Sequence, residues 1–128
     1  MKIQFLGKSS EHGDSPTLYA TDRATYLVQG WKVTDPDLLA TLDVSDDETV
    51  VEIYARLMNH LVNDGKTGIV TRWIPPIVHV QENGNLAIQG KQVTDPETLA
   101  QMNIPDHEDV VEVGKAAVEA LLHEGEEA

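Results

Sequence analysis

Apolar residues of this chain occur in short runs between turn residues, and the same order of runs appears twice. In each half two β-favouring runs flank a polar turn, which is typical of a β-hairpin. The paired runs are residues 18–20 with 25–28 and residues 78–80 with 86–88. Asn83-Gly84 in the second turn strongly favours a tight hairpin. Gly30 and Gly90 are expected to break the last strand of each hairpin and indicate a bulge or the close approach of another backbone.

Each half continues with a helix, a strand and a second helix. Asp35 or Thr34 can cap a helix over residues 36–42, with Pro36 in its first turn. The equivalent helix is expected over residues 96–102, where Thr94 and Glu97 have the spacing of a capping box. Residues 50–53 and 110–113 are β-branched runs that predict strands. Apolar residues at helical spacing predict the last helix of each half: Leu57, Met58, Leu61 and Val62, and Ala117, Val118, Leu121 and Leu122.

The two halves align without a gap at a constant shift of sixty positions, as "VTDPDLLATL" and "VTDPETLAQM" illustrate. About sixteen of the fifty aligned positions are identical. We therefore predict an α+β fold in which two tandem β-β-α-β-α repeats pack with pseudo-twofold symmetry into one compact domain. Residues 1–15 would form an N-terminal strand and a polar loop, 16–65 the first repeat, 66–75 a connecting strand and 76–125 the second repeat.

Charge narrows the functions that are open to the chain. The 128 residues include 22 acidic and 9 basic residues, which gives a formal net charge of −13. Because nucleic-acid binding depends on Lys and Arg that neutralise phosphates, direct binding to DNA, RNA or an anionic membrane is not expected. The chain lacks cysteine and shows no signal or membrane-spanning segment, so a cytoplasmic address is expected.

No catalytic motif is present in the sequence. The five histidines form no pattern of zinc ligands, and the acidic stretches 43–48 and 106–109 lack the spacing of calcium loops and are expected to be solvated turns. We predict no cofactor, no metal and no enzymatic activity. The alternative is a small-ligand site or a minor enzyme with a pocket between the repeats. Its residues would be Glu52, Glu112, His60 and His79.

Aromatic residues distinguish the two halves, since Trp31, Tyr19, Tyr26 and Tyr54 align with Lys91, His79, Leu86 and Gly114. An aromatic group with a charged rim is typical of a protein contact surface. The predicted surface consists of Trp31, Tyr19, Tyr26, Asp22 and Asp35. The polar stretch 7–15, which the second half lacks, is a further candidate for a binding loop.

The segment "SPTLYATDRATYLVQGWKVTDPDLLATL", residues 15–42, resembles a group of small actinobacterial proteins that are often encoded beside helix-turn-helix regulators. The resemblance covers mainly the first half and implies a bacterial, regulatory context without an assigned activity. Together with the charge, it favours an acidic protein-interaction module whose partner is basic, such as a DNA-binding regulator. Oligomerisation through exposed hairpin edges is a third interpretation.

Overall fold

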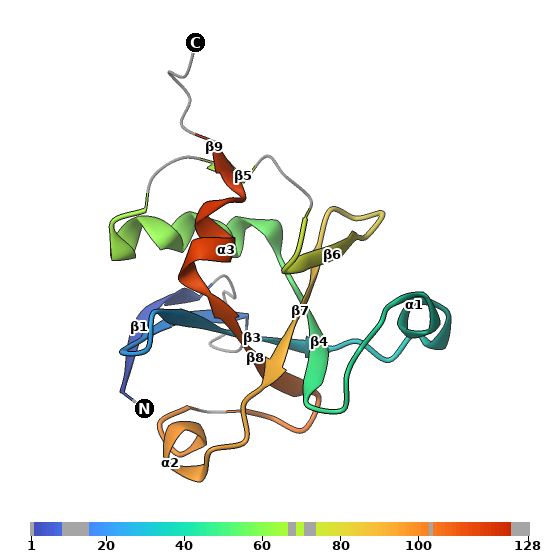
Figure 1. The fold of residues 1–128 in the computed structure, drawn as a ribbon, viewed down its shortest axis with the longest axis horizontal. Coiled ribbons are helices and arrows are strands. Elements are labelled where there is room, and N and C mark those ends of the chain that lie inside the picture. Colours follow the sequence, from blue (N-terminus) through green and yellow to red (C-terminus); the bar gives the residue numbers. More distant parts are fainter. Residues whose placement is uncertain (1, 9–15, 67–68, 71–73, 103, 124–128) are drawn as a thin grey trace.

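A computed structural model of the chain describes residues 2–8, 16–66, 69–70, 74–102 and 104–123 (Figure 1). It is a mixed α+β protein with mostly antiparallel strands and few, short helices. Its strands are β1 (Ile3–Lys8), β2 (Thr17–Thr21), β3 (Thr25–Lys32), β4 (Glu48–Ile53), β5 (Ile69–Val70), β6 (Ile77–Val80), β7 (Leu86–Gln92), β8 (Glu108–Gly114) and β9 (Leu122–His123). Its helices are α1 (Pro36–Thr41), the 3₁₀ helix η1 (Ala55–Asp64), α2 (Pro96–Leu99) and α3 (Lys115–Glu119). Most of the candidate binding loop, residues 9–15, lies outside the described residues.

Both predicted hairpins are confirmed, as β2 pairs with β3 and β6 pairs with β7, each antiparallel. Gly84 adopts a φ of 90° in the second turn, a conformation that glycine reaches without strain. The predicted N-terminal strand is also present, because β1 pairs with β2. Of the connecting segment, Ile69 and Val70 form β5, which pairs with β9.

The central strands exchange partners between the two halves of the chain. β3 pairs with β8 from Thr25↔Gly114 to Trp31↔Glu108, and β4 pairs with β7 from Glu48↔Lys91 to Ile53↔Leu86. Shorter contacts join β3 to β4 at Trp31↔Glu52 and β7 to β8 at Lys91↔Glu112. These four strands therefore close a ring of pairings, and the hairpin strands β2 and β6 extend it on either side. Each half contributes strands to the sheet of the other, so neither half is a separate unit.

Gly30 and Gly90 do not interrupt their strands as expected, because β3 and β7 continue past them. Each glycine instead lies where another backbone comes very close. A Cβ built on Gly30 would lie 2.5 Å from the carbonyl oxygen of Glu52, and one on Gly90 would lie 2.7 Å from that of Glu112. The close approach predicted from the sequence is thus correct, and the break in the strand is wrong.

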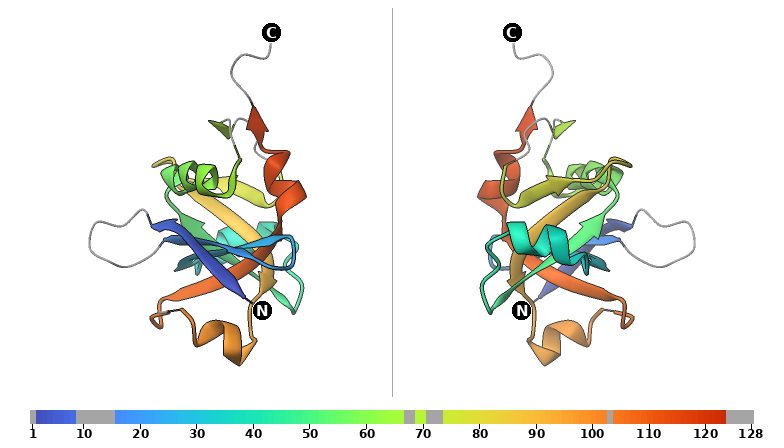
Figure 2. Two further views of the ribbon diagram at one scale, coloured as in Figure 1. Left: turned by 90° about the vertical axis from the view of Figure 1, so that its left-hand side faces the viewer. Right: turned by 90° about the vertical axis from the view of Figure 1, so that its right-hand side faces the viewer.

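Two apolar clusters form the core. The larger lies between the strands, η1 and α3, and contains Tyr26, Val51, Leu57, Leu61 and Leu121 among its buried residues. The smaller is formed by Leu27, Val93 and Val110, with Ile3, Tyr19, Leu99, Met102 and Ile104 packed against it. Figures 1 and 2 show η1 and α3 at one end of the molecule and α2 at the opposite end, where the smaller cluster lies.

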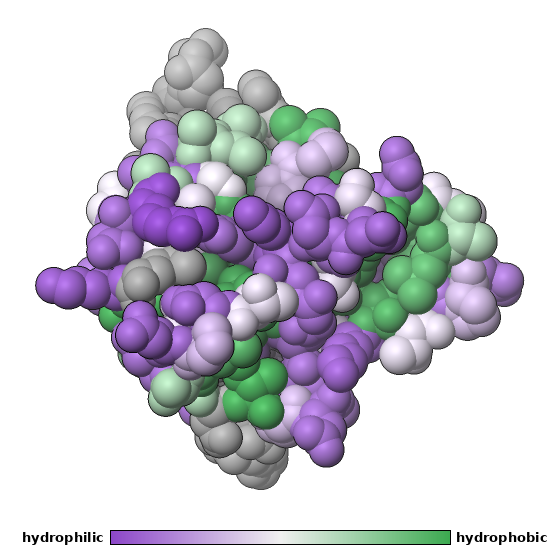
Figure 3. All heavy atoms as spheres, turned by 60° about the horizontal axis from the view of Figure 1, so that its bottom comes forward, coloured by the Kyte–Doolittle hydropathy of each residue, from purple (hydrophilic) through white to green (hydrophobic). Residues whose placement is uncertain are grey.

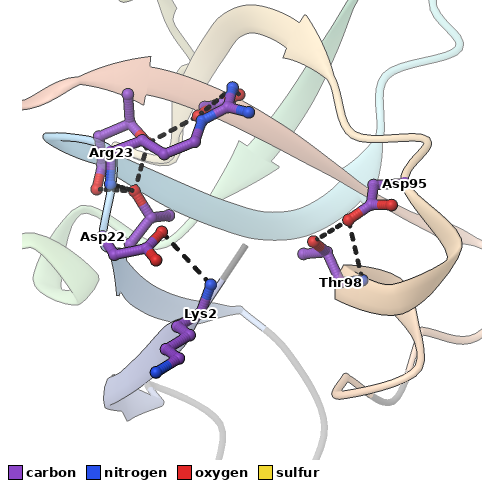
Figure 4. Close-up of polar contacts among 8 residues, drawn as sticks. Lys2, Asp22, Arg23, Asp95 and Thr98 are labelled. Carbon is purple, nitrogen blue, oxygen red and sulfur yellow. Dashed lines mark hydrogen bonds and ion pairs between the residues drawn. The ribbon is translucent and has the colours of Figure 1, made fainter.

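Aspartate side chains cap the N-termini of α1 and α2. Of the two cap candidates for α1, Asp35 is the N-cap residue, and its Oδ1 atom accepts a hydrogen bond of 3.0 Å from the backbone N–H of Asp37. Asp95 accepts bonds from the backbone N–H and the hydroxyl of Thr98, at 3.3 and 2.6 Å (Figure 4). These contacts confirm Asp35 as a cap. The capping box predicted from Thr94 and Glu97 is wrong, because Asp95 is the N-cap residue.

The last helix of each half differs from its prediction. Leu57, Met58 and Leu61 are buried as expected, but Val62 is 59% exposed. The tighter winding of the 3₁₀ helix turns this position away from the core. In the second half α3 ends at Glu119, and Leu122 belongs to β9 instead of the helix.

Candidate functional site

The five residues of the predicted contact surface do not come together. Asp22 lies in the turn before β3 and Asp35 follows β3, so the two carboxylates stand beyond opposite ends of this eight-residue strand. Tyr19 is half-buried against the smaller cluster, where its ring meets the edge of Phe5 at a centroid distance of 6.1 Å. Asp22 accepts a hydrogen bond of 3.3 Å from the backbone N–H of Lys2 (Figure 4). Tyr19 and Asp22 therefore tie the N-terminal strand to the fold.

Tyr26 was expected on the surface, and this is wrong because its side chain is fully buried. Its hydroxyl donates a hydrogen bond of 2.7 Å to Asp64, which also forms an ion pair of 3.0 Å with Lys115. Burial raises the pKa of Tyr26, and the bond to Asp64 raises it further. Burial alone would raise the pKa of Asp64, but the hydrogen bonds from Tyr26 and Lys115 hold it below its ordinary value. This triad joins β3, the end of η1 and α3.

Replacing Tyr26 with phenylalanine removes the hydroxyl and preserves the ring. Because the bond is made to a carboxylate, we expect Tyr26→Phe to lower the free energy of unfolding by about 1.5–3 kcal/mol at pH 7. The pKa of Asp64 is lower in the folded protein than in the unfolded chain, where it is about 3.9. The charged carboxylate therefore stabilises the fold at pH values above the unfolded-state pKa, and this stabilisation is lost as the pH falls through the folded-state pKa. Urea titrations at steps from pH 7 down to pH 2 should therefore show a difference between wild type and variant that becomes smaller as the Asp64 carboxylate of the folded protein is protonated. A difference that stays constant over this range would contradict the role of the charged carboxylate.

Trp31 retains a place on the surface. It is half-buried at the end of β3, and its ring meets the edge of Tyr54 at 5.0 Å with an interplanar angle of 84°. The guanidinium of Arg56 lies 4.2 Å from the centre of the Tyr54 ring. Trp31 stands directly across from Glu52 in the β3–β4 pairing. Directly paired residues project from the same face of a sheet, so Trp31 and Glu52 share one face. Tyr54 follows β4, and its ring contact with Trp31 places it beside this face.

A surface hollow of about 600 Å³ lies beside Glu52, which forms part of its lining. The described residues around it are Glu52, His79, Val80, Gln81, Glu82 and Asn83. Glu52 accepts a hydrogen bond of 2.8 Å from the side-chain amide of Asn85 and a longer one, 3.5 Å, from that of Gln81. Its carboxylate is thus bound by neutral amide donors beside an open space. The hollow combines a residue of the first half with residues of the second.

The four residues of the alternative pocket do not share one site. Glu52 and His79 line the same hollow. Glu112 is instead held by Arg23 and Thr25, and the His60 Nε2 atom lies 3.0 Å from the carbonyl oxygen of Lys8. The structure therefore separates Glu112 and His60 from the other two residues.

Two features were missed by the sequence analysis. Tyr54 was noticed as a difference between the halves, but only its ring contact places it beside Trp31. Glu108 was expected in a solvated turn, yet it is 2% exposed and accepts a hydrogen bond of 2.8 Å from Gln29. Its Oε2 atom has no hydrogen-bond partner among the described residues and lies 3.4 Å from His107 Nε2. The position of Glu108 at the start of a β-branched strand is the signal that could have indicated burial.

The side of the molecule that carries α1 is less covered than the side that carries α2. None of the α1 residues is buried, and Leu38, Leu39 and Leu42 are only half-buried. In contrast, Leu99 and Met102 at α2 pack against the smaller cluster. Figure 3 shows apolar atoms exposed around α1, at the right of the view. Trp31 and this apolar surface lie at the same end of β3.

Among the residues described, no group of three or more His, Asp or Glu side chains could hold a metal ion. In the same part of the chain, no helix has both the length and the apolar character needed to span a bilayer. Comparisons with models of protein families, with curated proteins and with solved structures give no match.

Proposed function

We propose that the chain is a non-enzymatic, acidic interaction module that binds a basic segment of another protein. The observation that carries the proposal is the half-exposed pair of Trp31 and Tyr54 on the same face as Glu52. Aromatic anchors beside a charged rim are the arrangement that dominates binding energy in protein interfaces. The net charge of −13 favours a basic partner and steers it toward the surface. The half-exposed apolar residues of α1, next to Asp35, would extend the contact.

The architecture and the biological setting of the chain are further parts of its proposed function. We propose that residues 16–65 and 76–125 are β-β-α-β-α repeats related by a pseudo-twofold axis. The strand registers support this, since Trp31↔Glu52 and Lys91↔Glu112 are the same pairing shifted by sixty positions. We further propose that the partner is a cytoplasmic protein such as a DNA-binding regulator, because residues 15–42 resemble proteins that are encoded beside such regulators.

Trp31→Ala is expected to remove the anchor of this contact. Truncation of a hot-spot residue costs 2 kcal/mol or more, so the affinity should fall by about 30-fold. The variant should remain folded because Trp31 is only half-buried. It loses the apolar area that the indole buries and, beyond that area, an aromatic contact worth about 0.5–1.5 kcal/mol. The measurement is capture of partners from the native cell extract at low and high salt, followed by titration of the captured protein.

Phe5→Ala is the matched control, because Phe5 is an aromatic residue that is 56% exposed on β1. It should leave capture unchanged. A basic partner that is captured at low salt, released at high salt and lost with Trp31→Ala supports the proposal. Capture that both variants retain would overturn it.

A second candidate function is a small-ligand site in the hollow at Glu52. The specific observation in its favour is that the lining comes from both halves of the chain. Amide chemical shifts measured against a library of small polar metabolites would test it. Shifts confined to Gln81 and its neighbours, without any captured protein, would favour this candidate over the interaction module.

A further inference from the structure

Glu52 and Glu112 occupy equivalent positions sixty residues apart but have different partners. The Arg23 Nη2 atom donates to both carboxylate oxygens of Glu112, at 3.0 and 3.1 Å, and Thr25 Oγ1 donates at 2.7 Å. Arg23 projects from the hairpin turn between β2 and β3 to reach this carboxylate. The chain thus neutralises Glu112 with an arginine of its own.

The corresponding arginine is missing at Glu52. Asn83 stands at the position equivalent to Arg23, and Asn85 stands at the position equivalent to Thr25. Asn85 reproduces the hydrogen bond of Thr25, at 2.8 Å. The side chain of Asn83 is shorter than that of arginine and ends in a neutral amide, and it lines the open hollow beside Glu52. In the part of the chain that the structure describes, no lysine or arginine forms an ion pair with Glu52.

The residues across from the two glutamates also differ in charge. Lys91 lies across from Glu112, whereas Trp31 lies across from Glu52. Glu82 adds a second carboxylate to the hollow. Indole and phenol rings attract a cation through their faces, and guanidinium combines this with hydrogen bonds to a carboxylate. Arg23 and Lys91 thus lie beside Glu112. Near Glu52, Arg56 of the chain stacks on the Tyr54 ring, so the indole of Trp31 and the carboxylate of Glu52 are the groups suited to receive a cation from a partner.

We propose that the hollow at Glu52 binds an arginine side chain of the protein partner, in the way that Glu112 binds Arg23. The inference rests on the proposed function and specifies the group that is recognised. Each oxygen of Glu52 accepts one hydrogen bond from a neutral amide, at 2.8 and 3.5 Å, and keeps further acceptor capacity. The planar fork of guanidinium can donate to both oxygens at once, whereas a lysine ammonium acts as a point charge. Arg23 and Glu112 provide an internal example of an arginine bound to this glutamate position at a hairpin turn, there through Nη2 alone.

The test uses the peptide Ac-Val-Arg-Val-NH₂ and its citrulline counterpart, which has nearly the same shape without the charge. Amide chemical shifts of the full chain should move at Gln81, Asn83 and Asn85 with the arginine peptide. The citrulline peptide should bind at least 10-fold more weakly. Equal binding of the two peptides, or equal binding of Ac-Val-Lys-Val-NH₂, would overturn the assignment of arginine.

Two substitutions separate the site from general electrostatics. Glu52→Gln should weaken binding of the arginine peptide at least 10-fold, whereas the matched change Glu112→Gln, which removes the same charge elsewhere, should not. Asn83→Arg places a guanidinium where the first half has Arg23, so it should abolish peptide binding and raise the thermal midpoint. Unchanged binding in both Glu52→Gln and Asn83→Arg would overturn the proposal.

Failure of this inference is distinguishable from failure of the proposed function. A partner that depends on Trp31 but is retained by Glu52→Gln would contradict the arginine site and leave the interaction module intact. If the proposed function and the arginine site are both correct, Glu52→Gln and Trp31→Ala should each lose the partner. Circular dichroism should show that both variants keep the fold.

Discussion

Leu61→Ala is expected to lower the free energy of unfolding by about 2–5 kcal/mol, the range for a large-to-small change in a core. Leu61 is 2% exposed and belongs to the larger cluster with Tyr26 and Val51. It lies on η1, which covers the strands at one end of the molecule, so the cavity would open between this helix and the sheet. Urea unfolding followed by circular dichroism measures the loss.

Val62→Ala is the matched control for this prediction, since it removes apolar atoms from the next residue of the same helix. Val62 is 59% exposed, and we expect a change within about 0.5 kcal/mol. Similar losses for the two variants would mean that both residues face the core, as a regular α-helix would place them. That result would contradict the 3₁₀ winding of η1.

Gly30→Ala is the second substitution with a large expected effect. A Cβ at Gly30 would lie 2.5 Å from the Glu52 carbonyl oxygen and 2.8 Å from Ile53 Cγ2. The backbone oxygen cannot turn away as a flexible side chain could, so β3 and β4 would have to separate. We expect a loss of about 1–3 kcal/mol, the usual cost of overpacking, measured by thermal and urea unfolding. Because the displaced strand carries Glu52, binding of the arginine peptide should weaken as well.

Gly114→Ala serves as the control, because a Cβ at Gly114 would meet nothing within 4 Å and its φ is −70°. Its stability should change by no more than about 0.5 kcal/mol. Gly90→Ala should resemble Gly30→Ala, since its Cβ would lie 2.7 Å from the Glu112 carbonyl oxygen. If Gly30→Ala and Gly114→Ala were equally stable, the close approach of β4 to Gly30 would be contradicted.

Prediction of the candidate site from the sequence succeeded in part. Trp31 and Glu52 were both named, although as members of two different hypotheses, and the structure places them across from each other. Tyr26 was misassigned because an aromatic residue in a strand gives no sign of which face it occupies when both sheet faces contact apolar clusters. Its partner Asp64 is 38 residues away, and no local pattern connects the two.

Local chemistry alone determined the hairpins, the β-branched strands and the start of α1, whose cap it narrowed to Thr34 or Asp35. Turn preferences, side-chain caps and alternation act between residues a few positions apart, so they can be read along the chain. Only the tertiary structure decided which strands pair. The runs Val50-Val51-Glu52 and Val110-Val111-Glu112 are identical. No local feature therefore determines whether such a strand pairs mainly with the hairpin of its own half or with the hairpin of the other half. The exchange of β4 and β8 places Asn83 and Arg23 beside equivalent glutamates, and that contact between distant segments makes one site closed and the other open.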